Sequence, residues 1–388
     1  MKEERRCVVA LVISNLEFGG AERQVVELAN HLSAEEFDVH VVSLSAYVPL
    51  ATHLKPGRAT LHIVDKRFKF DAALIPRLAK LLRRIRADIV HGFLFDAEIA
   101  SRMAGRLAHV PVIIGSERNA DYFMPARKRI LYRLTSFAMD VCIANSNSGA
   151  DFNSRVFGLE RSRYRVVYNG VDTARFRDRD KIAIRAKLGI PTDSFCVGVF
   201  GSFKPQKNHL LFFTAAGRLV ESCPKATFLV VGDTLEGGRR NSVSYKARVI
   251  ELVRQLGLED RCRFLGNRDD VEELYCACDV TVLPSLHEGT PNVALESMAS
   301  HVPVIATDVS DNRYVIPDGV AGFIVSLGDA DSLASRMLEL WAKPDERARM
   351  SRAARRRVEE RFSMDRLAND TADVYRQMLM LKHTRERA

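Results

Sequence analysis

The 388-residue sequence lacks several patterns that define common classes of protein. It has no apolar run near the roughly 18 residues of a membrane-spanning helix. It contains no G-x-G-x-x-G, no P-loop and no His-Glu-x-x-His or zinc-ligand spacing. A dinucleotide oxidoreductase, a nucleoside triphosphatase and a zinc enzyme therefore lose support. With 47% hydrophobic and 28% charged residues the chain has a globular composition, and its length predicts two domains.

Cysteine is sparse, and its seven positions form no recognisable pairing pattern. Several cysteines lie in apolar, strand-like runs, so we expect reduced, buried thiols in a cytosolic protein. Cys276 and Cys278 lack metal-ligand spacing, which favours packing on a helix. Charges precede the apolar run at 8–14, but no small-residue cleavage site follows. We therefore expect a buried first strand and no signal peptide.

The net charge of +9 is unevenly distributed along the chain. Residues 1–170 contain 25 Lys and Arg against 18 Asp and Glu, whereas the rest contains 33 against 31. A basic first half suits an anionic partner, such as a membrane surface, a phosphorylated acceptor or nucleic acid. The basic segments 77–86 and 127–133 interleave with apolar residues. As amphipathic helices they present a basic face either to anionic lipid or simply to solvent.

Short β-branched runs alternate with amphipathic helical stretches throughout the chain. The runs are continuously apolar, as is typical of strands that helices cover on both faces. This rhythm predicts an α/β protein of doubly wound parallel sheets. The expected strands are 8–14, 37–45, 61–65, 88–93, 110–116, 141–146, 164–170, 195–202, 226–233, 261–266, 280–284, 303–308 and 322–326. The expected helices include 21–32, 74–86, 97–108, 127–138, 331–342, 345–361 and about 364–381.

The alternation of strands and helices occurs twice along the chain, and a polar stretch separates the two occurrences. This stretch predicts a domain boundary near 172–194. We expect an N-terminal domain over 1–171, a C-terminal domain over 172–363 and a final helical segment over 364–388. Ligands of such sheets bind outside the carboxyl ends of the strands. We therefore expect a ligand cleft between the carboxyl ends of two sheets.

The segment 284–296 carries the strongest local signal. Thr290 is expected to cap a helix whose first residue is Pro291, because proline needs no amide donor there. The free amides and the dipole of a helix start favour phosphate. Glu288 in the turn and Glu296 on the helix then flank the phosphate, and their carboxylates accept hydrogen bonds from sugar and ribose hydroxyls. The alternative is a plain strand–turn–helix with two solvated glutamates.

Two other turns follow a strand and open a helix. Gly19 and Gly20 let the backbone approach a phosphate closely, and Lys207 supplies a positive charge after the strand at 195–202. Each signal alone is weak, since such turns often contain glycine and Lys207 is equally an exposed residue at a helix start. Three turns of this kind together favour a nucleotide-diphosphate ligand.

These motifs resemble glycosyltransferase family 4, retaining enzymes with the GT-B fold that act in bacterial polysaccharide and glycoconjugate synthesis. The resemblance covers roughly residues 8–365 in order. Its specific part is Glu288-Gly289-x-Pro291-Asn292-x-x-x-Glu296, the family's E-x7-E element, with the strand at 303–306. The other matching segments are Gly19-Gly20-Ala21-Glu22, Asn169-Gly170-Val171-Asp172, Lys207-Asn208 and Phe264-Leu265-Gly266.

The resemblance implies two Rossmann-like domains facing across a cleft, the first binding the acceptor and the second a nucleotide-diphosphate sugar. A UDP-sugar is the preferred donor, and a GDP-sugar is the alternative. Glu288 is expected to meet the sugar hydroxyls, Glu296 the ribose and Lys207 the pyrophosphate. Gly20 is expected to bring its amide to the β-phosphate, and the final helix to cross back to the N-terminal domain. The implied donor-binding residues are Gly19, Gly20, Ser202, Lys207, Asn267, Arg268, Glu288, Gly289, Thr290, Pro291, Asn292 and Glu296. The implied catalytic residues are Glu288, Lys207 and Arg118.

Two positions depart from the family pattern. Ser202 stands where many members carry an arginine after the glycine of the phosphate loop. Lys204 is the candidate substitute, although Arg and Lys are not interchangeable at a bidentate site. Many members also place a histidine where this chain has Glu117 and Arg118. The acceptor-side candidates are therefore these two residues and His91, which is expected either to face the cleft or to fill a structural position.

The resemblance implies front-face attack by an acceptor hydroxyl in a metal-independent, retaining, hexosyltransferase-type reaction. No cofactor is expected, because the nucleotide sugar is a substrate. The D-x-D patterns at 178–180 and 329–331 lie in a linker and at a helix start, where Asp is a common cap. The expected location is cytoplasmic, with peripheral attachment to the inner membrane as a hypothesis. Two alternatives stay open: a nucleotide-sugar epimerase or hydrolase of the same fold, and a basic nucleic-acid-binding protein without a recognition motif.

Overall fold

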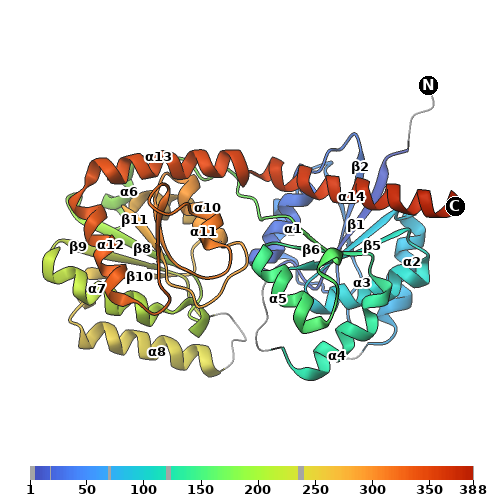
Figure 1. Cartoon of the computed structure of the whole chain (residues 1–388), viewed down its shortest axis with the longest axis horizontal. Coiled ribbons are helices and arrows are strands. Elements are labelled where there is room, and N and C mark those ends of the chain that lie inside the picture. Colours follow the sequence, from blue (N-terminus) through green and yellow to red (C-terminus); the bar gives the residue numbers. More distant parts are fainter. Residues whose placement is uncertain (1–4, 18, 69–70, 119–123, 235–239, 388) are drawn as a thin grey trace. The chain divides into compact units, whose positions relative to one another are not determined.

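The computed structural model describes residues 5–17, 19–68, 71–118, 124–234 and 240–387. The chain divides into two compact units. Unit 1 comprises Met1–Gly170 and Met364–Ala388, and unit 2 comprises Val171–Ser363 (Figure 1). The C-terminal segment thus packs with the first unit, although it follows the second in the sequence.

Unit 1 contains a seven-stranded parallel sheet with the order β3-β2-β1-β4-β5-β6-β7. Its strands are β1 Cys7–Ile13, β2 Phe37–Ser43, β3 Ala59–Ile63, β4 Ile89–Phe93, β5 Val112–Glu117, β6 Val141–Ala144 and β7 Tyr164–Val166. Its α-helices are α1 Gly20–His31, α2 Leu74–Ile85, α3 Phe95–Ala108, α4 Ala126–Thr135, α5 Asn147–Phe157 and α14 Met364–Arg387.

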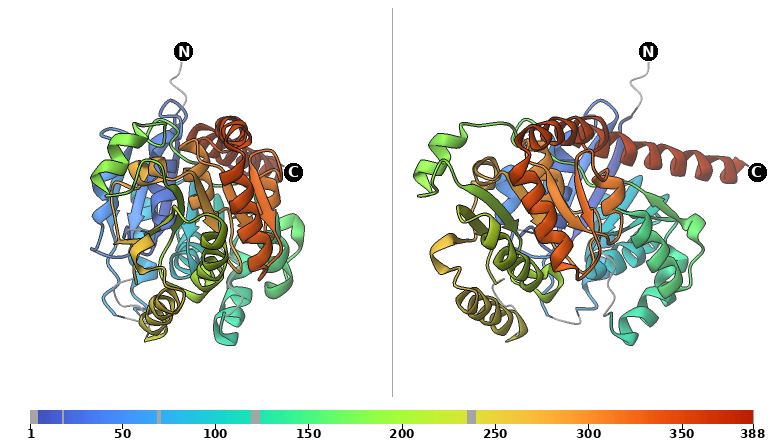
Figure 2. Two further views of the ribbon diagram at one scale, coloured as in Figure 1. Left: turned by 90° about the vertical axis from the view of Figure 1, so that its left-hand side faces the viewer. Right: turned by 60° about the vertical axis from the view of Figure 1, so that its left-hand side comes forward.

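Helices cover both faces of this sheet. Strand β1 has apolar side chains on both of its faces, one set for each layer of helices. Val9 and Leu11 join the core beneath α1 and α14, whereas Ala10 and Val12 join the core beneath α2 and α3. Successive side chains of a strand point to opposite faces, so a strand buried on both faces must be apolar throughout. Figures 1 and 2 show α14 running beside the strands of unit 1.

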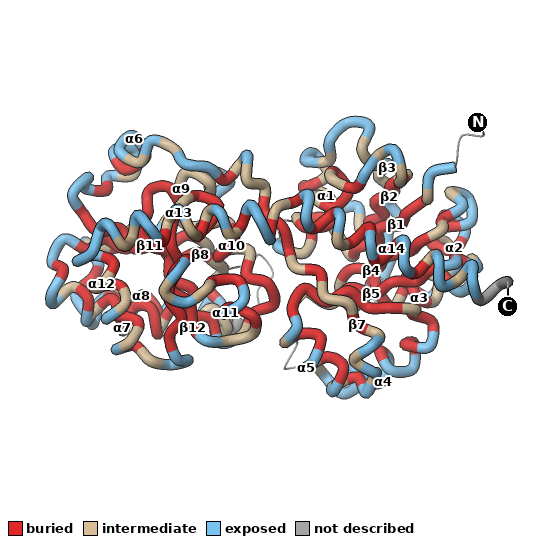
Figure 3. The backbone as a smooth tube through the Cα atoms, turned by 45° about the horizontal axis from the view of Figure 1, so that its top comes forward, coloured by how far each residue is buried: buried red, intermediate tan, exposed pale blue. Residues whose placement is uncertain are grey.

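Unit 2 contains a six-stranded parallel sheet with the order β10-β9-β8-β11-β12-β13. Its strands are β8 Phe195–Phe200, β9 Ala226–Val231, β10 Cys262–Gly266, β11 Val280–Leu283, β12 Val304–Thr307 and β13 Gly322–Val325. Its α-helices are α6 Lys181–Lys187, α7 His209–Ser222, α8 Arg240–Gln255, α9 Val271–Ala277, α10 Asn292–Ala299, α11 Asn312–Val315, α12 Ala330–Ala342 and α13 Pro344–Arg361. The inner strands of both sheets are buried, for example β4 in unit 1 and β8 and β11 in unit 2 (Figure 3).

The predicted fold class, two doubly wound parallel sheets, is confirmed. The sequence pattern missed α6, which lies inside the polar stretch assigned to the linker. Asp180 caps this helix by accepting a hydrogen bond from the Ala183 amide (3.0 Å). Arg185 on α6 is buried and donates to the Asp279 carboxylate (2.7 Å). A helix of seven residues is shorter than the window of about 11–18 residues over which a helical periodicity can be recognised.

All seven cysteines are unpaired, and all except Cys7 are buried. Burial raises the pKa of the Cys276 thiol to about 11, which keeps this sulfur protonated and unreactive at neutral pH. Cys276 lies on α9, as the helix-packing interpretation predicts. Within the described residues, none of the helices carries the long apolar stretch needed to cross a bilayer.

Candidate functional site

The loops after β8 and β11 lie side by side in unit 2. The strand order reverses between these two neighbouring strands, because β9 and β10 extend from β8 while β12 and β13 extend from β11. In open α/β sheets this switch point, at the carboxyl ends of the strands, is where ligands bind. Lys207 follows β8 and Glu288 follows β11. The topology therefore brings together two predicted residues that are far apart in sequence.

Lys207 and Glu288 form an ion pair at this switch point. The Lys207 Nζ donates to Glu288 Oε1 at 2.6 Å, and their side chains are 20% and 8% exposed. Charges that are largely withdrawn from water need a partner of opposite charge. Here the Lys207 ammonium and the Glu288 carboxylate neutralise each other. An anionic ligand that binds Lys207 would also free the Glu288 carboxylate to accept hydrogen bonds.

The Glu288 loop is held from both neighbouring loops. On one side the Gln206 side chain donates to the His287 carbonyl (2.8 Å), and the Leu286 amide donates to the Gln206 carbonyl (2.8 Å). On the other side the Ser310 hydroxyl accepts from the Glu288 amide (3.1 Å) and donates to its carbonyl (2.6 Å). These contacts fix the peptide that carries the Glu288 side chain, which is how a site is made rigid.

Sequence reasoning missed Gln206 and Ser310 as parts of the site. Gln206 adjoins Lys207, and Ser310 lies after β12, the next strand in the sheet, in a left-handed backbone conformation (φ 51°). Both positions follow the carboxyl end of a strand. That position is the signal that would have found them, because a polar residue there can reach the neighbouring loop.

Helix α10 begins one residue later than predicted. Its first residue is Asn292, and Pro291 occupies the cap position in extended conformation without a side-chain cap. The prediction of Thr290 as cap and Pro291 as first helical residue is therefore wrong. The Pro291 carbonyl instead accepts the first helical hydrogen bonds, from Ala294 (3.0 Å) and Leu295 (3.2 Å). Gly289 and Thr290 are buried in the turn before it.

Glu296 lies on α10 and is held by an aromatic residue. The Tyr275 hydroxyl donates to Glu296 Oε2 at 2.9 Å. The Tyr275 ring is buried and stacks on Phe200, the last residue of β8, with ring centroids 3.9 Å apart. Tyr275 was not singled out from the sequence, and it ties the second glutamate of the E-x7-E element to the end of the central strand.

The loops after β8, β9 and β10 pack closely through their glycines. Gly232 has φ 126°, and a Cβ there would lie 2.3 Å from the Gly201 carbonyl oxygen. The Gly232 amide donates to the Gly266 carbonyl (2.8 Å). Ser202 therefore lies at the same edge as Asn267 and Arg268. The exposed Arg268 is held by the carboxylate of Asp270 through two hydrogen bonds of 2.8 and 2.6 Å.

In unit 1 the predicted glycines open α1. Gly19 is the cap and Gly20 the first helical residue. The Glu22 side chain folds back over the cap, so that a Cβ on Gly19 would lie 2.0 Å from Glu22 Oε2. Gln24 on the same helix donates to the Gly170 carbonyl (2.9 Å) and accepts from the Gly170 amide (3.1 Å). Gly20 belongs to unit 1, whereas the predicted phosphate-binding turns after β8 and β11 belong to unit 2. The contact of Gly20 with a donor phosphate therefore stays a prediction.

Of the acceptor-side candidates, Glu117 is the last residue of β5 and Arg118 follows the strand. Arg118 donates to Asn169 Oδ1 (3.1 Å), and its guanidinium lies 5.0 Å from the Phe93 ring centroid. Burial lowers the pKa of Arg118 to about 10. Glu117 Oε2 accepts a hydrogen bond from Nδ2 of the Asn153 side chain (3.3 Å). The next residues, 119–123, lie outside the described residues.

His91 fills a structural position. It is fully buried in β4, and its Nδ1 lies 2.8 Å from the Tyr375 hydroxyl on α14. Its ring packs against Phe93, with centroids 4.1 Å apart. Burial lowers the pKa of His91 well below its usual value, so the imidazole is neutral at pH 7. The prediction that His91 faces an open cleft is wrong, because the C-terminal helix covers it.

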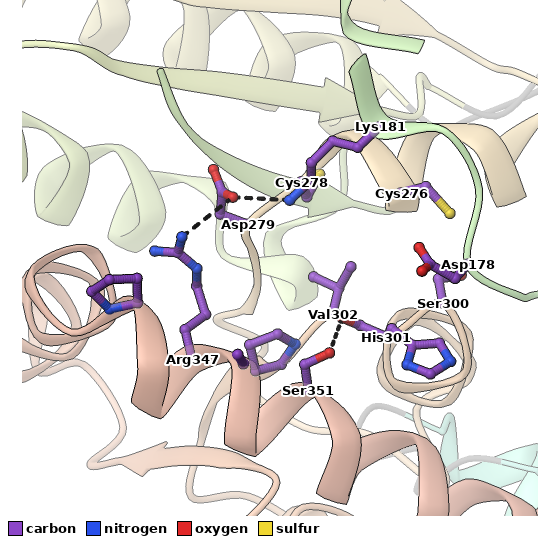
Figure 4. Close-up of a pocket in the computed structure, with 13 residues that line it drawn as sticks. Asp178, Lys181, Cys276, Cys278, Asp279, Ser300, His301, Val302, Arg347 and Ser351 are labelled. Carbon is purple, nitrogen blue, oxygen red and sulfur yellow. Dashed lines mark hydrogen bonds and ion pairs between the residues drawn. The ribbon is translucent and has the colours of Figure 1, made fainter. Parts of the chain in front are cut away.

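A hollow of about 240 Å³ lies at the opposite edge of the unit 2 sheet (Figure 4). Its cations are already engaged by the protein. Lys181 and Arg347 both point toward Asp279, with nitrogen–oxygen distances of 2.9 and 3.8 Å. Their charges are compensated there, which indicates a structural network at the amino ends of the strands.

Among the described residues, one group of three potential metal ligands has its ligand atoms within 4.8 Å of one another, namely Glu98, Glu117 and Cys142. Arg102 and the Tyr132 hydroxyl already donate to Glu98 Oε1, so this carboxylate has partners within the protein. Of the D-x-D patterns, Asp329 caps α12 by accepting from the Ser332 amide (2.9 Å). Asp180 caps α6 in the same way.

Two family models match the chain. The model described as Glycosyltransferase Family 4 matches residues 18–175. The model described as Glycosyl transferases group 1 matches residues 180–357. The second range contains Lys207, Glu288 and the residues that hold them.

Two similar proteins match this chain over most of their own length. The chain is 26% identical to the UDP-Gal:alpha-D-GlcNAc-diphosphoundecaprenol alpha-1,3-galactosyltransferase of Escherichia coli, over 94% of this chain and 95% of that protein. It is 28% identical to the D-inositol 3-phosphate glycosyltransferase of Streptomyces bingchenggensis, over 92% of this chain and 84% of that protein.

Solved structures share the fold at lower sequence identity. Anabaena HepE in complex with UDP has a TM-score of 0.83 and 21% identity, over 95% of this chain and 99% of that one. A glycosyltransferase from Rickettsia africae has a TM-score of 0.81 and 20% identity, over 97% of this chain and 99% of that one.

Proposed function

The chain belongs to the GT-B glycosyltransferases, and we propose that it transfers a sugar from a UDP-sugar to a hydroxyl of a glycan or lipid-linked acceptor. The UDP complex of HepE supports the choice of nucleotide. The relative from Escherichia coli, named for a diphosphoundecaprenol acceptor, supports the acceptor class. We assign donor binding to unit 2 and acceptor binding to the more basic unit 1.

The observation that carries this proposal is the Lys207–Glu288 ion pair at the switch point of the unit 2 sheet. Cleavage of the sugar–phosphate bond develops negative charge on the leaving diphosphate and positive charge on the sugar. Lys207 is proposed to bind the diphosphate, and Glu288 to accept hydrogen bonds from the sugar hydroxyls. The proposed donor site also includes Glu296 for the ribose and the backbone of Gly289–Asn292.

We further propose retention of the anomeric configuration and independence from metal. Lys207 supplies positive charge where a metal ion would otherwise be needed. Glu288 is held against Lys207, so we assign it to binding rather than nucleophilic attack. The acceptor hydroxyl then attacks from the face that the diphosphate leaves, and the leaving phosphate takes its proton.

Product analysis tests this function. Purified enzyme incubated with a UDP-sugar and a diphosphoprenyl-linked sugar is expected to form one new glycosidic bond per UDP released, with EDTA present and with retained configuration by NMR. UDP release at the same rate without acceptor would indicate a hydrolase, and a new nucleotide sugar without UDP release would indicate an epimerase. Either result would contradict the proposal.

Helix α4 supports our further proposal of peripheral attachment to an anionic membrane. Two exposed apolar residues lie at its end, Leu134 at 68% exposure and Phe137, just beyond the helix, at 67%. Four cations and no acidic residue occur between positions 124 and 139. Apolar side chains surrounded by cations suit the surface of a bilayer containing anionic lipid.

Vesicle co-sedimentation tests this attachment. At low salt the protein is expected to bind phosphatidylglycerol vesicles in preference to phosphatidylcholine vesicles. Leu134→Ser/Phe137→Ser is expected to weaken that binding by about tenfold or more, because each buried side chain contributes about 1.5–3 kcal/mol. Trp341→Ser, which alters an exposed aromatic residue of unit 2, is the control. Equal binding of both vesicle types would contradict the attachment.

A further inference from the structure

A second hollow in unit 1 is strongly basic. It lies between the edge strand β3 and helix α2, with a volume of about 750 Å³. Five of its ten lining residues are cationic, and one, Asp65, is acidic. The cations are Arg67, Arg77, Lys80, Arg83 and Arg84. The described site in unit 2 uses none of them.

Asp71 holds one of these cations in a fixed position. Arg77 donates to Asp71 Oδ2 (2.6 Å) and to the Asp65 carbonyl (2.8 Å). Asp71 in turn accepts from the amides of Arg67 and Ala73, each at 3.1 Å. The hydrogen bond from the Arg67 amide is the largest cause that lowers the pKa of Asp71. This wall of the hollow is therefore organised before any ligand arrives.

Lys80 and Arg84 are organised differently. Within the described part of the chain, neither side chain forms a hydrogen bond or an ion pair with the protein. They stand four residues apart on α2, where like charges repel each other. The sequence from 72 to 87 contains no acidic residue that would compensate them. Uncompensated cations around a hollow favour an anion from outside the chain.

We propose that this hollow binds a phosphate group. A phosphate offers several strong acceptor oxygens and a charge of about −1.5 to −2 at pH 7, which suits several converging cations. The volume leaves room for the molecule that carries the phosphate, which is either a phospholipid headgroup or a soluble phosphate ester. The inference does not depend on the proposed sugar transfer, because it concerns other residues.

Binding measurements with a double variant test this site. Lys80→Gln/Arg84→Gln removes the two uncompensated charges, and both residues are exposed, so the fold is expected to persist with an unchanged melting temperature. The matched control is Arg352→Gln/Arg356→Gln, which removes two exposed arginines at the same spacing from α13 in unit 2. sn-Glycerol 3-phosphate is titrated calorimetrically with UDP present to occupy the proposed donor site.

The expected result is affinity about tenfold lower for the α2 variant than for the wild type and the control. A parallel loss of binding to phosphatidylglycerol vesicles assigns the site to a lipid headgroup, and unchanged vesicle binding assigns it to a soluble phosphate ester. The proposal is overturned if sn-glycerol 3-phosphate binds all three proteins equally, or binds none of them at millimolar concentration.

Discussion

Glu288→Gln is expected to lower kcat/KM for sugar transfer by at least about 10²-fold. A hydrogen bond to a charged group contributes about 1.5–3 kcal/mol. Two sugar hydroxyls bound to one carboxylate would therefore account for about 3–6 kcal/mol, or about 10²- to 10⁴-fold in rate. Glutamine keeps the size and one acceptor oxygen but loses the charge. It still accepts a hydrogen bond from Lys207, so the loop is expected to stay folded.

Steady-state kinetics with a saturating acceptor measure this effect, and thermal unfolding monitors the fold. Glu251→Gln, which neutralises an exposed carboxylate on α8, is the control and is expected to leave kcat/KM unchanged. If Glu288→Gln keeps more than half of the wild-type kcat/KM, the sugar is bound elsewhere and our assignment of Glu288 fails.

Arg102→Met is expected to destabilise unit 1 by about 3–5 kcal/mol, the usual result of breaking a buried ion pair. Arg102 and Glu98 form such a pair on α3, with side chains 0% and 2% exposed. Arg102 also donates to the Tyr132 carbonyl (3.2 Å) and Thr135 Oγ1 (3.3 Å) of α4. Its loss leaves Glu98 buried without a counter-charge and removes the two hydrogen bonds from Arg102 to α4.

The pH dependence of that loss provides a specific check. Burial raises the pKa of Glu98, and Arg102 opposes this effect. Without Arg102 the pKa rises further, so the folded variant holds a proton that the unfolded chain releases above about pH 4.3. Stability is then lost as pH increases, and urea denaturation is expected to show a larger deficit at about pH 8 than at about pH 5.

The double variant Glu98→Leu/Arg102→Met separates lost charge from lost packing. Replacing a whole buried ion pair by apolar residues is often neutral or stabilising, so most of the stability is expected to return. A deficit in Arg102→Met that is independent of pH, and that the double variant does not reduce, would show that the carboxylate was not the cause.

Most of the fold was predictable because the inner strands of both sheets, such as β1, β4, β8 and β11, are apolar and buried nearly throughout. The run at 8–14, for example, matches β1 within one residue at each end. Parallel topology also explains why turns at the carboxyl ends of strands were sound candidates for the site. Lys207 and Glu288 were both identified in this way, although they are 81 residues apart.

Other features depend on packing that one segment of sequence does not contain. The sequence left His91 open between a cleft-facing and a structural role, and the structural role is confirmed because Tyr375, 284 residues later, packs against it. The roles of Gln206 and Ser310 depend on which loops are neighbours, which follows from the strand order. The hollow beside α2 likewise exists only because β3 is the edge strand of its sheet.

The most direct test of the central claim is a crystal structure of the full chain with UDP bound. We predict that the diphosphate lies at the carboxyl ends of β8 and β11, with a phosphate oxygen about 2.7–3.2 Å from Lys207 Nζ. The Lys207–Glu288 contact is then expected to lengthen beyond hydrogen-bonding distance. UDP bound in any other hollow, with this ion pair unchanged, would contradict the account.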